Sequence, residues 1–260
     1  MALIHETNQY QIPRGRVYFD PFDANGNPTG EREFGNCPGF SVSVETTKSD
    51  HYASTGGLRE KDGSWVLEVN RSGALTCDNL SGANVALFLS GEEDTVSQTN
   101  TAVTDETIKV IPGRTYQLGK TTANPAGHRN VSAVIVTNSA GTTTYVLGTD
   151  YALDPALGRL QILASGTIVA GDIKVDYAKP AATWARVKTG SKSELSGALR
   201  VIADNAAGEN RDWYMPKVTL TPNGELPIIS DATDVASMEF TVEVLKPANG
   251  EAIYIDGRPA

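Results

Sequence analysis

Histidines are the first residues to consider for acid–base or metal chemistry, because imidazole titrates near neutral pH and often binds metal ions. The chain has three of them, His5, His51 and His128, far apart and each in a polar, loop-like context. No pair has the spacing that places two imidazoles on one face of a helix. The sequence also lacks a glycine-rich dinucleotide motif, a phosphate-binding loop and a nucleophile elbow. We therefore predict no catalytic residue, no cofactor and no enzymatic activity.

The segment "DANGNPTGE" is the part of the sequence that most resembles a calcium-binding loop. Side-chain oxygens recur at alternate positions in Asp23, Asn25 and Asn27, as calcium loops require. Residues 29–30 interrupt this series, and Glu31 is misplaced for a bidentate ligand. The segment is also rich in residues that favour turns. We expect an exposed turn here and no metal site.

Length, charge and cysteine content limit the classes of protein that fit. The 260 residues suffice for one large β domain or two smaller ones. The net charge of −9 disfavours a surface that binds nucleic acid, but it suits one that must not adhere to it. Cys37 and Cys77 form no Cys-x-x-Cys motif and are expected to be reduced. We find no apolar run long enough to cross a bilayer and no signal-peptide pattern, so neither a membrane location nor export is indicated.

Alternating apolar and polar residues, separated by Gly, Pro and Asn, predict that the chain is mainly β. One segment differs, because "NVALF" is preceded by candidate capping residues and followed by Gly91. We predict a helix over residues 80–90 that covers a sheet face, with a buried strand at "VALFL" as the alternative. The predicted strands are 15–20, 40–46, 65–70, 107–111, 131–137, 144–147, 159–163, 172–177, 198–203, 217–221 and 237–245.

Composition changes near residue 119, where short predicted strands alternate with turns as far as "AKPAAT", which resembles a linker. We predict an inserted surface β module over residues 119–181. The remaining segments, 1–118 and 182–260, would then form one discontinuous domain.

Three predicted strands share an apolar face and a polar, acidic face. In "SMEFTVEVL" the apolar residues alternate with Glu239, Thr241 and Glu243, and "FSVSVET" and "WVLEVN" have the same design. The pattern of "WVLEVN" places Trp65 on the apolar face. The polar face is almost free of Lys and Arg, whereas the solvated face of an ordinary β-sandwich mixes both signs of charge.

Residues 46–64, "TTKSDHYASTGGLREKDGS", lie between two of these strands. Antiparallel neighbours can be joined by two to five residues, so this polar connection is unusually long. We predict a long loop that would suit an arm reaching another molecule.

Several patterns together resemble the tail tube (major tail) proteins of long-tailed, non-contractile bacteriophages. They are "GRVYFD", "TGEREFGNCPGFSVSVETTKSDHY", "GALRVIADNAAGENRDWYMPKVTLTPNGEL" and "MEFTVEVL", and the resemblance covers residues 14–117 and 195–246. It implies a two-sheet β-sandwich or half-barrel with one flanking helix. Such subunits form rings, usually hexamers, that stack into a tube. An outward-facing module would clash with a contractile sheath, which favours the non-contractile class.

The resemblance also implies where assembly contacts would lie. The long loop would reach the adjacent ring, and the acidic face would line a lumen through which DNA passes without specific binding. The lumen-facing candidates are Glu45, Glu68, Glu239 and Glu243. The candidates for the loop between rings are Thr47, Lys48, Asp50, His51, Tyr52, Leu58, Arg59, Glu60, Lys61 and Asp62.

The resemblance further implies partners and a location. The subunit would contact copies of itself, a tape measure protein, a tail terminator and distal tail or baseplate proteins. It would lie in the virion tail, after assembly in the bacterial host cytoplasm. Alternatives are a tail terminator, a baseplate hub, the inner tube of a contractile system, or a carbohydrate-binding or adhesive β-sandwich. The last predicts clustered exposed aromatics, whereas Trp65, Trp184 and Trp213 are scattered along the sequence.

Overall fold

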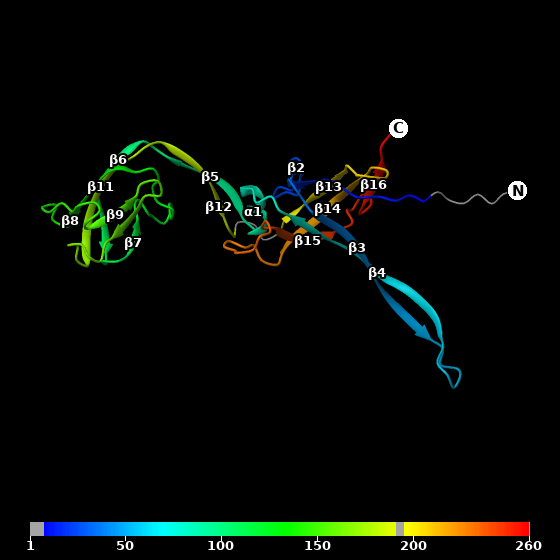
Figure 1. Cartoon of the computed structure of the whole chain (residues 1–260). Helices are drawn as coiled ribbons and strands as arrows, with labels where there is room; N and C mark the ends of the chain where they lie inside the picture. Colours follow the sequence, from blue (N-terminus) through cyan, green and yellow to red (C-terminus); the bar gives the residue numbers. More distant parts are fainter. Residues whose placement is uncertain (1–7, 191–194, 260) are drawn as a thin grey trace. The chain divides into compact units, whose positions relative to one another are not determined.

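The computed structural model describes residues 8–190 and 195–259, and within them the protein is mainly β with one helix, as predicted (Figure 1). The chain divides into two compact units. The first consists of the described residues of Met1–Asp94 and Val187–Ala260, and the second of Thr95–Arg186. No helix within the described ranges is long and apolar enough to cross a membrane.

One antiparallel sheet of eight strands forms the first unit. Its order is β2-β1-β13-β14-β15-β4-β3, and β16 pairs with the first half of β14. The edges of the ordered path are therefore β2 and β3. The strands are β1 Gly15–Pro21, β2 Arg32–Glu33, β3 Gly39–Tyr52, β4 Lys61–Cys77, β13 Leu195–Ala203, β14 Arg211–Asn223, β15 Met238–Val244 and β16 Tyr254–Gly257.

Alternation along β15 decides which face of this sheet is buried. Met238, Phe240, Val242 and Val244 are buried, and the residues between them are exposed. Full burial of such side chains contributes about 1.5–3 kcal/mol each. Phe240 packs against aromatic rings from the segment before β3 and from the helix, with ring centroids about 6 Å apart. The predicted apolar face of this strand is confirmed.

The helix α1, Gly82–Phe88, supports this core, and the alternative of a buried strand is wrong. The Ser81 side chain caps the helix by accepting a hydrogen bond from the backbone N–H of Asn84. The fully buried Asn84 amide donates to the carbonyls of Phe34 (2.7 Å) and Asn79 (2.8 Å) and accepts from Arg32 (2.7 Å). Because every polar atom of this amide is paired, it can be buried without a large penalty.

Two three-stranded antiparallel sheets, β6-β11-β8 and β7-β10-β9, enclose the core of the second unit. A two-stranded sheet of β5 and β12 contains the points where the chain passes from one unit to the other. The strands are β5 Glu92–Gln98, β6 Thr101–Val110, β7 Thr115–Gln117, β8 Ser132–Asn138, β9 Tyr151–Asp154, β10 Arg159–Ile162, β11 Gly171–Lys179 and β12 Ala182–Lys188.

The predicted boundaries of the inserted module, 119–181, differ from those in the structure. The second unit begins at Thr95, because β6 pairs with β11 along nearly its whole length and thus belongs to this core. The predicted strand 144–147 is wrong, since Thr144 and Leu147 make only isolated bridges. The strands β2, β5, β7, β9, β12 and β16 were not predicted from the sequence.

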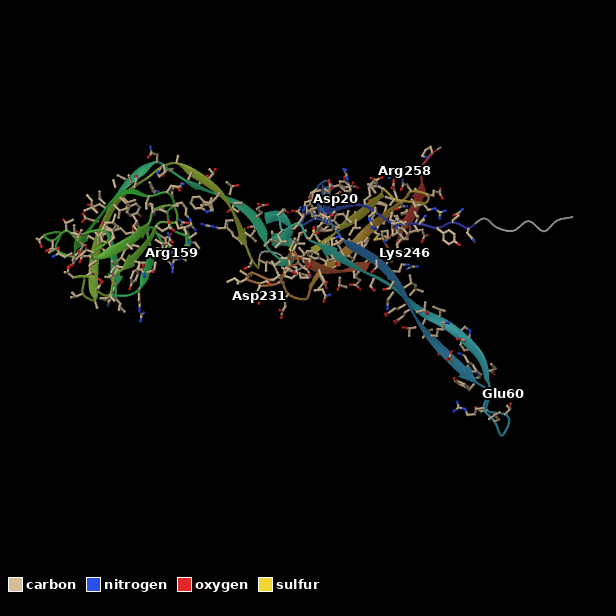
Figure 2. All side chains as sticks on the ribbon, in the orientation of Figure 1. Asp20, Glu60, Arg159, Asp231, Lys246 and Arg258 are labelled. Atoms are coloured by element: carbon tan, nitrogen blue, oxygen red, sulfur yellow. The ribbon has the colours of Figure 1, made fainter. Side chains whose placement is uncertain are left out.

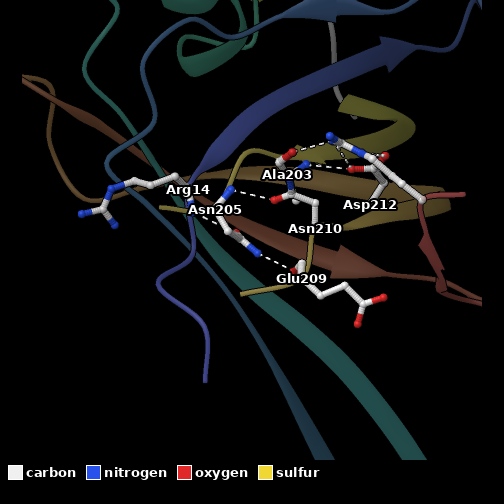
Figure 3. Close-up of polar contacts among 7 residues, drawn as sticks. Arg14, Ala203, Asn205, Glu209, Asn210 and Asp212 are labelled. Atoms are coloured by element: carbon white, nitrogen blue, oxygen red, sulfur yellow. Dashed lines mark hydrogen bonds and ion pairs between the residues drawn. The ribbon is translucent and has the colours of Figure 1, made fainter. Parts of the chain in front are cut away.

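A network of polar contacts surrounds the turn from β13 to β14 in the first unit (Figure 3). Asp212 accepts hydrogen bonds from the backbone N–H of Ala203 (2.8 Å) and from the Arg258 guanidinium (2.9 Å). Arg258 also donates to the carbonyl of Ala203. In the turn, Asn205 accepts from the backbone N–H of Arg14 (3.2 Å). The network therefore links three segments that are far apart in the sequence.

We predict that Arg258→Ala weakens the first unit in a pH-dependent way. The hydrogen bond from Arg258 lowers the pKa of Asp212 in the folded protein. The stability that this carboxylate contributes is therefore fully present above the unfolded pKa of about 3.9, and it is lost as the pH falls through the lower folded pKa. Urea unfolding at pH 7 should show a lower midpoint than that of the wild type, and the partial exposure of the pair keeps this decrease small. Between pH 5 and pH 2, the variant should lose less stability than the wild type. Lys246→Ala, which removes a more exposed pair with Glu251, is the control and should change little.

Candidate assembly surfaces

The hairpin of β3 and β4 extends well beyond the rest of its sheet (Figure 1). The two strands pair from Gly39 opposite Thr76 to Tyr52 opposite Lys61. Their neighbour β15 ends where Val244 lies opposite Arg71, so residues 45–70, here called the arm, form a ribbon of two strands. Glu60 belongs to the tip of the arm (Figure 2).

The prediction of a long loop over residues 46–64 is wrong in its local structure. Only residues 53–60 lie outside the strands, and a backbone hydrogen bond from Ala53 to Glu60 closes this tip. These strands were not predicted from the sequence because polar residues occupy both faces of the ribbon. Of the predicted contact residues, β3 contains Thr47, Lys48, Asp50, His51 and Tyr52, the tip contains Leu58, Arg59 and Glu60, and β4 contains Lys61 and Asp62.

Cross-strand polar contacts fix the register of the arm. Asp50 accepts from Lys61 (2.6 Å) and from the Ser64 hydroxyl (2.7 Å), and the Lys61 contact is the main cause of the lowered pKa of Asp50. His51 Nδ1 lies 2.5 Å from an oxygen of Asp62. Because these pairs are exposed, solvent screens them, and they define which residues lie opposite each other more than they stabilise the arm.

Apolar side chains of the arm are exposed, contrary to the prediction that Trp65 lies on a buried face. Trp65 is 57% exposed and Leu67 65% exposed, and Leu58 at the tip is 76% exposed. Beyond Arg71 the ribbon has no third strand, and the core of the first unit includes no residue of the arm. A ribbon with two unpaired edges and exposed apolar residues readily associates with another surface.

The four predicted lumen-facing glutamates share one face of the sheet. Opposite residues in an antiparallel pair lie on the same face, and side chains alternate along a strand. Glu243 lies opposite Ser72, which lies opposite Ser43, and the same parity includes Glu45 and Glu239. Glu68, opposite Thr47, continues this set. The acidic face is defined by Glu239, Thr241, Glu243, Glu68, Asn70, Ser72, Ala74, Thr76, Gly39, Ser41, Ser43, Glu45 and Thr47.

Negative charge is concentrated in the unit that carries this face. Between residues 95 and 186 the sequence has eight basic and six acidic residues, a net charge of +2. Subtracting this from −9 leaves −11 for the first unit. The acidic face itself contains four acidic residues and no Lys or Arg.

Two surface features were not predicted from the sequence. Leu67 is skipped where the pairing shifts between Thr47 opposite Glu68 and Lys48 opposite Val66, so it occupies a β-bulge. Ile228 and Ile229, in the connection from β14 to β15, are 93% and 95% exposed. The exposed isoleucines could have been predicted, because the two stand together in a connection between a proline and a Ser-Asp pair.

Residues considered for catalysis or metal binding do not come together. His51 and His128 belong to different units, and His5 lies outside the described residues. Asp23 Oδ1 accepts from the backbone N–H groups of Asn25 and Asn27, both at 2.8 Å, which builds an ordinary turn. In residues 8–190 and 195–259, no group of three or more His, Cys, Asp and Glu could hold a metal ion.

The two cysteines, far apart in the sequence, are neighbouring free thiols beside α1. Their mutual hydrogen bond lowers the pKa of Cys77 to about 7 and raises that of Cys37. Cys77 is buried among the core residues of the first unit. We therefore assign both cysteines to the packing of the first unit's core.

Comparison with known proteins shows which family the chain belongs to. Residues 10–251 match the model of a family described as "Protein of unknown function UCP028589". The chain belongs to this family. A comparison with curated proteins found no match. Because the matched range includes both units, the two-unit organisation lies within the family's extent.

The arm should be dispensable for folding. We predict that replacing residues 50–64 by Asn-Gly, which joins the opposite residues Ser49 and Trp65 by a two-residue turn, leaves the urea midpoint of the first unit unchanged. The physical reason is that these residues contribute nothing to its core. Phe240→Ala, a control inside that core, should destabilise by about 3–5 kcal/mol. A large loss of stability in the arm variant would contradict this prediction.

Proposed function

We propose that this protein is a tail tube (major tail) subunit of a long-tailed, non-contractile bacteriophage. It would polymerise as stacked rings around a conduit for DNA, and by analogy with the family it resembles these rings would be hexamers. The observation that carries the proposal is one sheet that combines an acidic face with a projecting arm of exposed apolar residues. A conduit for DNA needs the first feature and a self-stacking ring needs the second.

Free sheet edges support lateral assembly. The ordered path of the sheet ends at β2 on one side and at β3 on the other. An edge of one subunit could pair with the opposite edge of the next, and such head-to-tail contacts form rings when the rotation closes. In a ring joined this way, the acidic faces of all subunits would form one continuous wall.

The arm supports stacking of one ring on the next. A two-stranded ribbon is only marginally stable alone in water, and a partner surface would cover its apolar residues and order it. Contacts of this kind between rings are not closed by symmetry, so they propagate a filament.

The acidic face supports passage of DNA without adhesion. Phosphates and glutamates repel each other, and the field of six subunits would add within a narrow lumen. In this proposal the tube also contacts a tape measure protein, a tail terminator and distal tail or baseplate proteins. The subunit would assemble in the host cytoplasm and act in the virion tail.

The purified protein should form tubes as its concentration rises, visible by negative-stain electron microscopy and light scattering. Leu58→Asp combined with Leu67→Asp should abolish tubes, because the exposed arm residues would then meet their partner surface with unpaired charge. Val169→Asp changes an equally exposed residue of the second unit and is the matched control. Solitary molecules at every concentration, or tubes that survive the arm substitutions, would overturn the proposal.

Charge reversal on the acidic face should make tubes retain DNA. Glu239→Lys with Glu243→Lys leaves the buried face of β15 unchanged, so assembly should persist. Linear double-stranded DNA should then co-sediment with the tubes at low salt and dissociate at high salt. The control, Glu225→Lys with Asp234→Lys, makes the same change of charge in an exposed connection. Equal retention by both variants would remove the assignment of this face to the lumen.

A further inference from the structure

The second unit contains a basic cavity of about 240 Å³ that the proposed tube does not use. Its walls come from β5, β11, β12 and the connection between β7 and β8. The residues that matter for recognition are Asn124, His128, Lys179, Trp184 and Arg186. None of these five carries negative charge, in a protein whose net charge is −9.

Arg186 is held in place before any ligand arrives. Its guanidinium donates to the Asn124 side-chain oxygen at 2.7 Å and to the carbonyl of Ala123 at 3.4 Å. The Asn124 amide is itself fixed by donating to the carbonyl of Gly127 at 2.8 Å. A guanidinium has five N–H donors, so this one retains donors for a ligand. Its prior orientation reduces the entropy lost on binding.

A chain of hydrogen bonds orients His128 as well. The hydroxyl of Tyr177 donates to a carboxylate oxygen of Glu106 at 2.6 Å, so its oxygen accepts from His128 Nδ1 at 2.7 Å. The same carboxylate accepts from the backbone N–H of Gly119 at 2.8 Å. Burial and then the charge of Lys179 lower the pKa of His128, which is therefore neutral at pH 7. Its Nε2 is left as a hydrogen-bond acceptor.

The remaining two residues, Lys179 and Trp184, add a cation and an apolar surface. Across the described residues, no ion pair involves Lys179, so its ammonium is available to a ligand. Trp184 is half-buried and gives the cavity an aromatic wall. Its ring suits the apolar face of a sugar, because the ligand presents C–H groups there and hydroxyls at its rim. The cavity is smaller than sites for drug-sized ligands and suits a single sugar ring.

We propose that this cavity binds a saccharide unit that carries an anionic group, either a carboxylate or a phosphate. The anion contacts Arg186 and Lys179, the sugar ring packs on Trp184, and a hydroxyl donates to His128 Nε2. This inference does not depend on tube formation, since every residue involved belongs to the second unit.

Saturation-transfer difference NMR on the full chain tests this site, because it detects ligand protons whether or not the protein is assembled. The ligands are glucuronate, glucose 6-phosphate and glucose at matched ionic strength, and inorganic phosphate serves as a competitor. We expect saturable signals from one or both charged sugars and none from glucose at the same concentration. A response to one charged sugar alone identifies the anion as carboxylate or phosphate.

Substitutions then locate the site. Lys179→Gln and Trp184→Ala should each weaken binding by about tenfold or more, as expected for losing a charged hydrogen bond or a packing surface. Lys109→Gln removes an exposed cation of the same unit outside this cavity and should leave binding unchanged. Unfolding curves identify any variant that has lost its fold. Absence of binding, equal binding of glucose, full displacement by equimolar phosphate, or unaltered affinity in both cavity variants would overturn the proposal.

Discussion

The two-residue period of the antiparallel sheet is the constraint on which the assembly surfaces depend. Because the apolar side chains of β15 must face the core, its glutamates must face the other way, and β4 and β3 follow through their register. A shift of one residue would bury Glu239 and Glu243 and expose Phe240. The cost of burying those carboxylates therefore favours the same register as the burial of the apolar side chains.

The arm follows different physics, since it continues a sheet without continuing its core. Backbone pairing between β3 and β4 persists beyond the end of β15, and exposed cross-strand contacts maintain the register there. The exposed Trp65 and Leu67 gain little from this arrangement in an isolated subunit. They are understandable as surfaces completed by another molecule, and in the proposed tube that molecule is a subunit of the next ring.

The second unit has its own core and the opposite sign of net charge. The acidic character of the protein thus belongs to the unit that would surround DNA, while the basic cavity belongs to the other. In the two proposals, separate units carry the surface that repels DNA and the cavity that binds an anionic sugar.

Local patterns in the sequence determined the mainly-β class, the helix near residues 80–90 and the alternation of β15, because each depends on neighbouring residues. The parity of the four glutamates followed from the same period of two. Only the tertiary structure decided that residues 46–64 are mostly strand, that Trp65 is exposed, and that the second unit begins at Thr95. The first outcome depends on backbone hydrogen bonds within one hairpin, which form without a hydrophobic pattern. Trp65 is exposed because β15 ends before it, and the boundary at Thr95 depends on the pairing of β6 with the distant β11. The basic cavity likewise required folding, because residues as distant in sequence as Asn124 and Arg186 meet only through strand order.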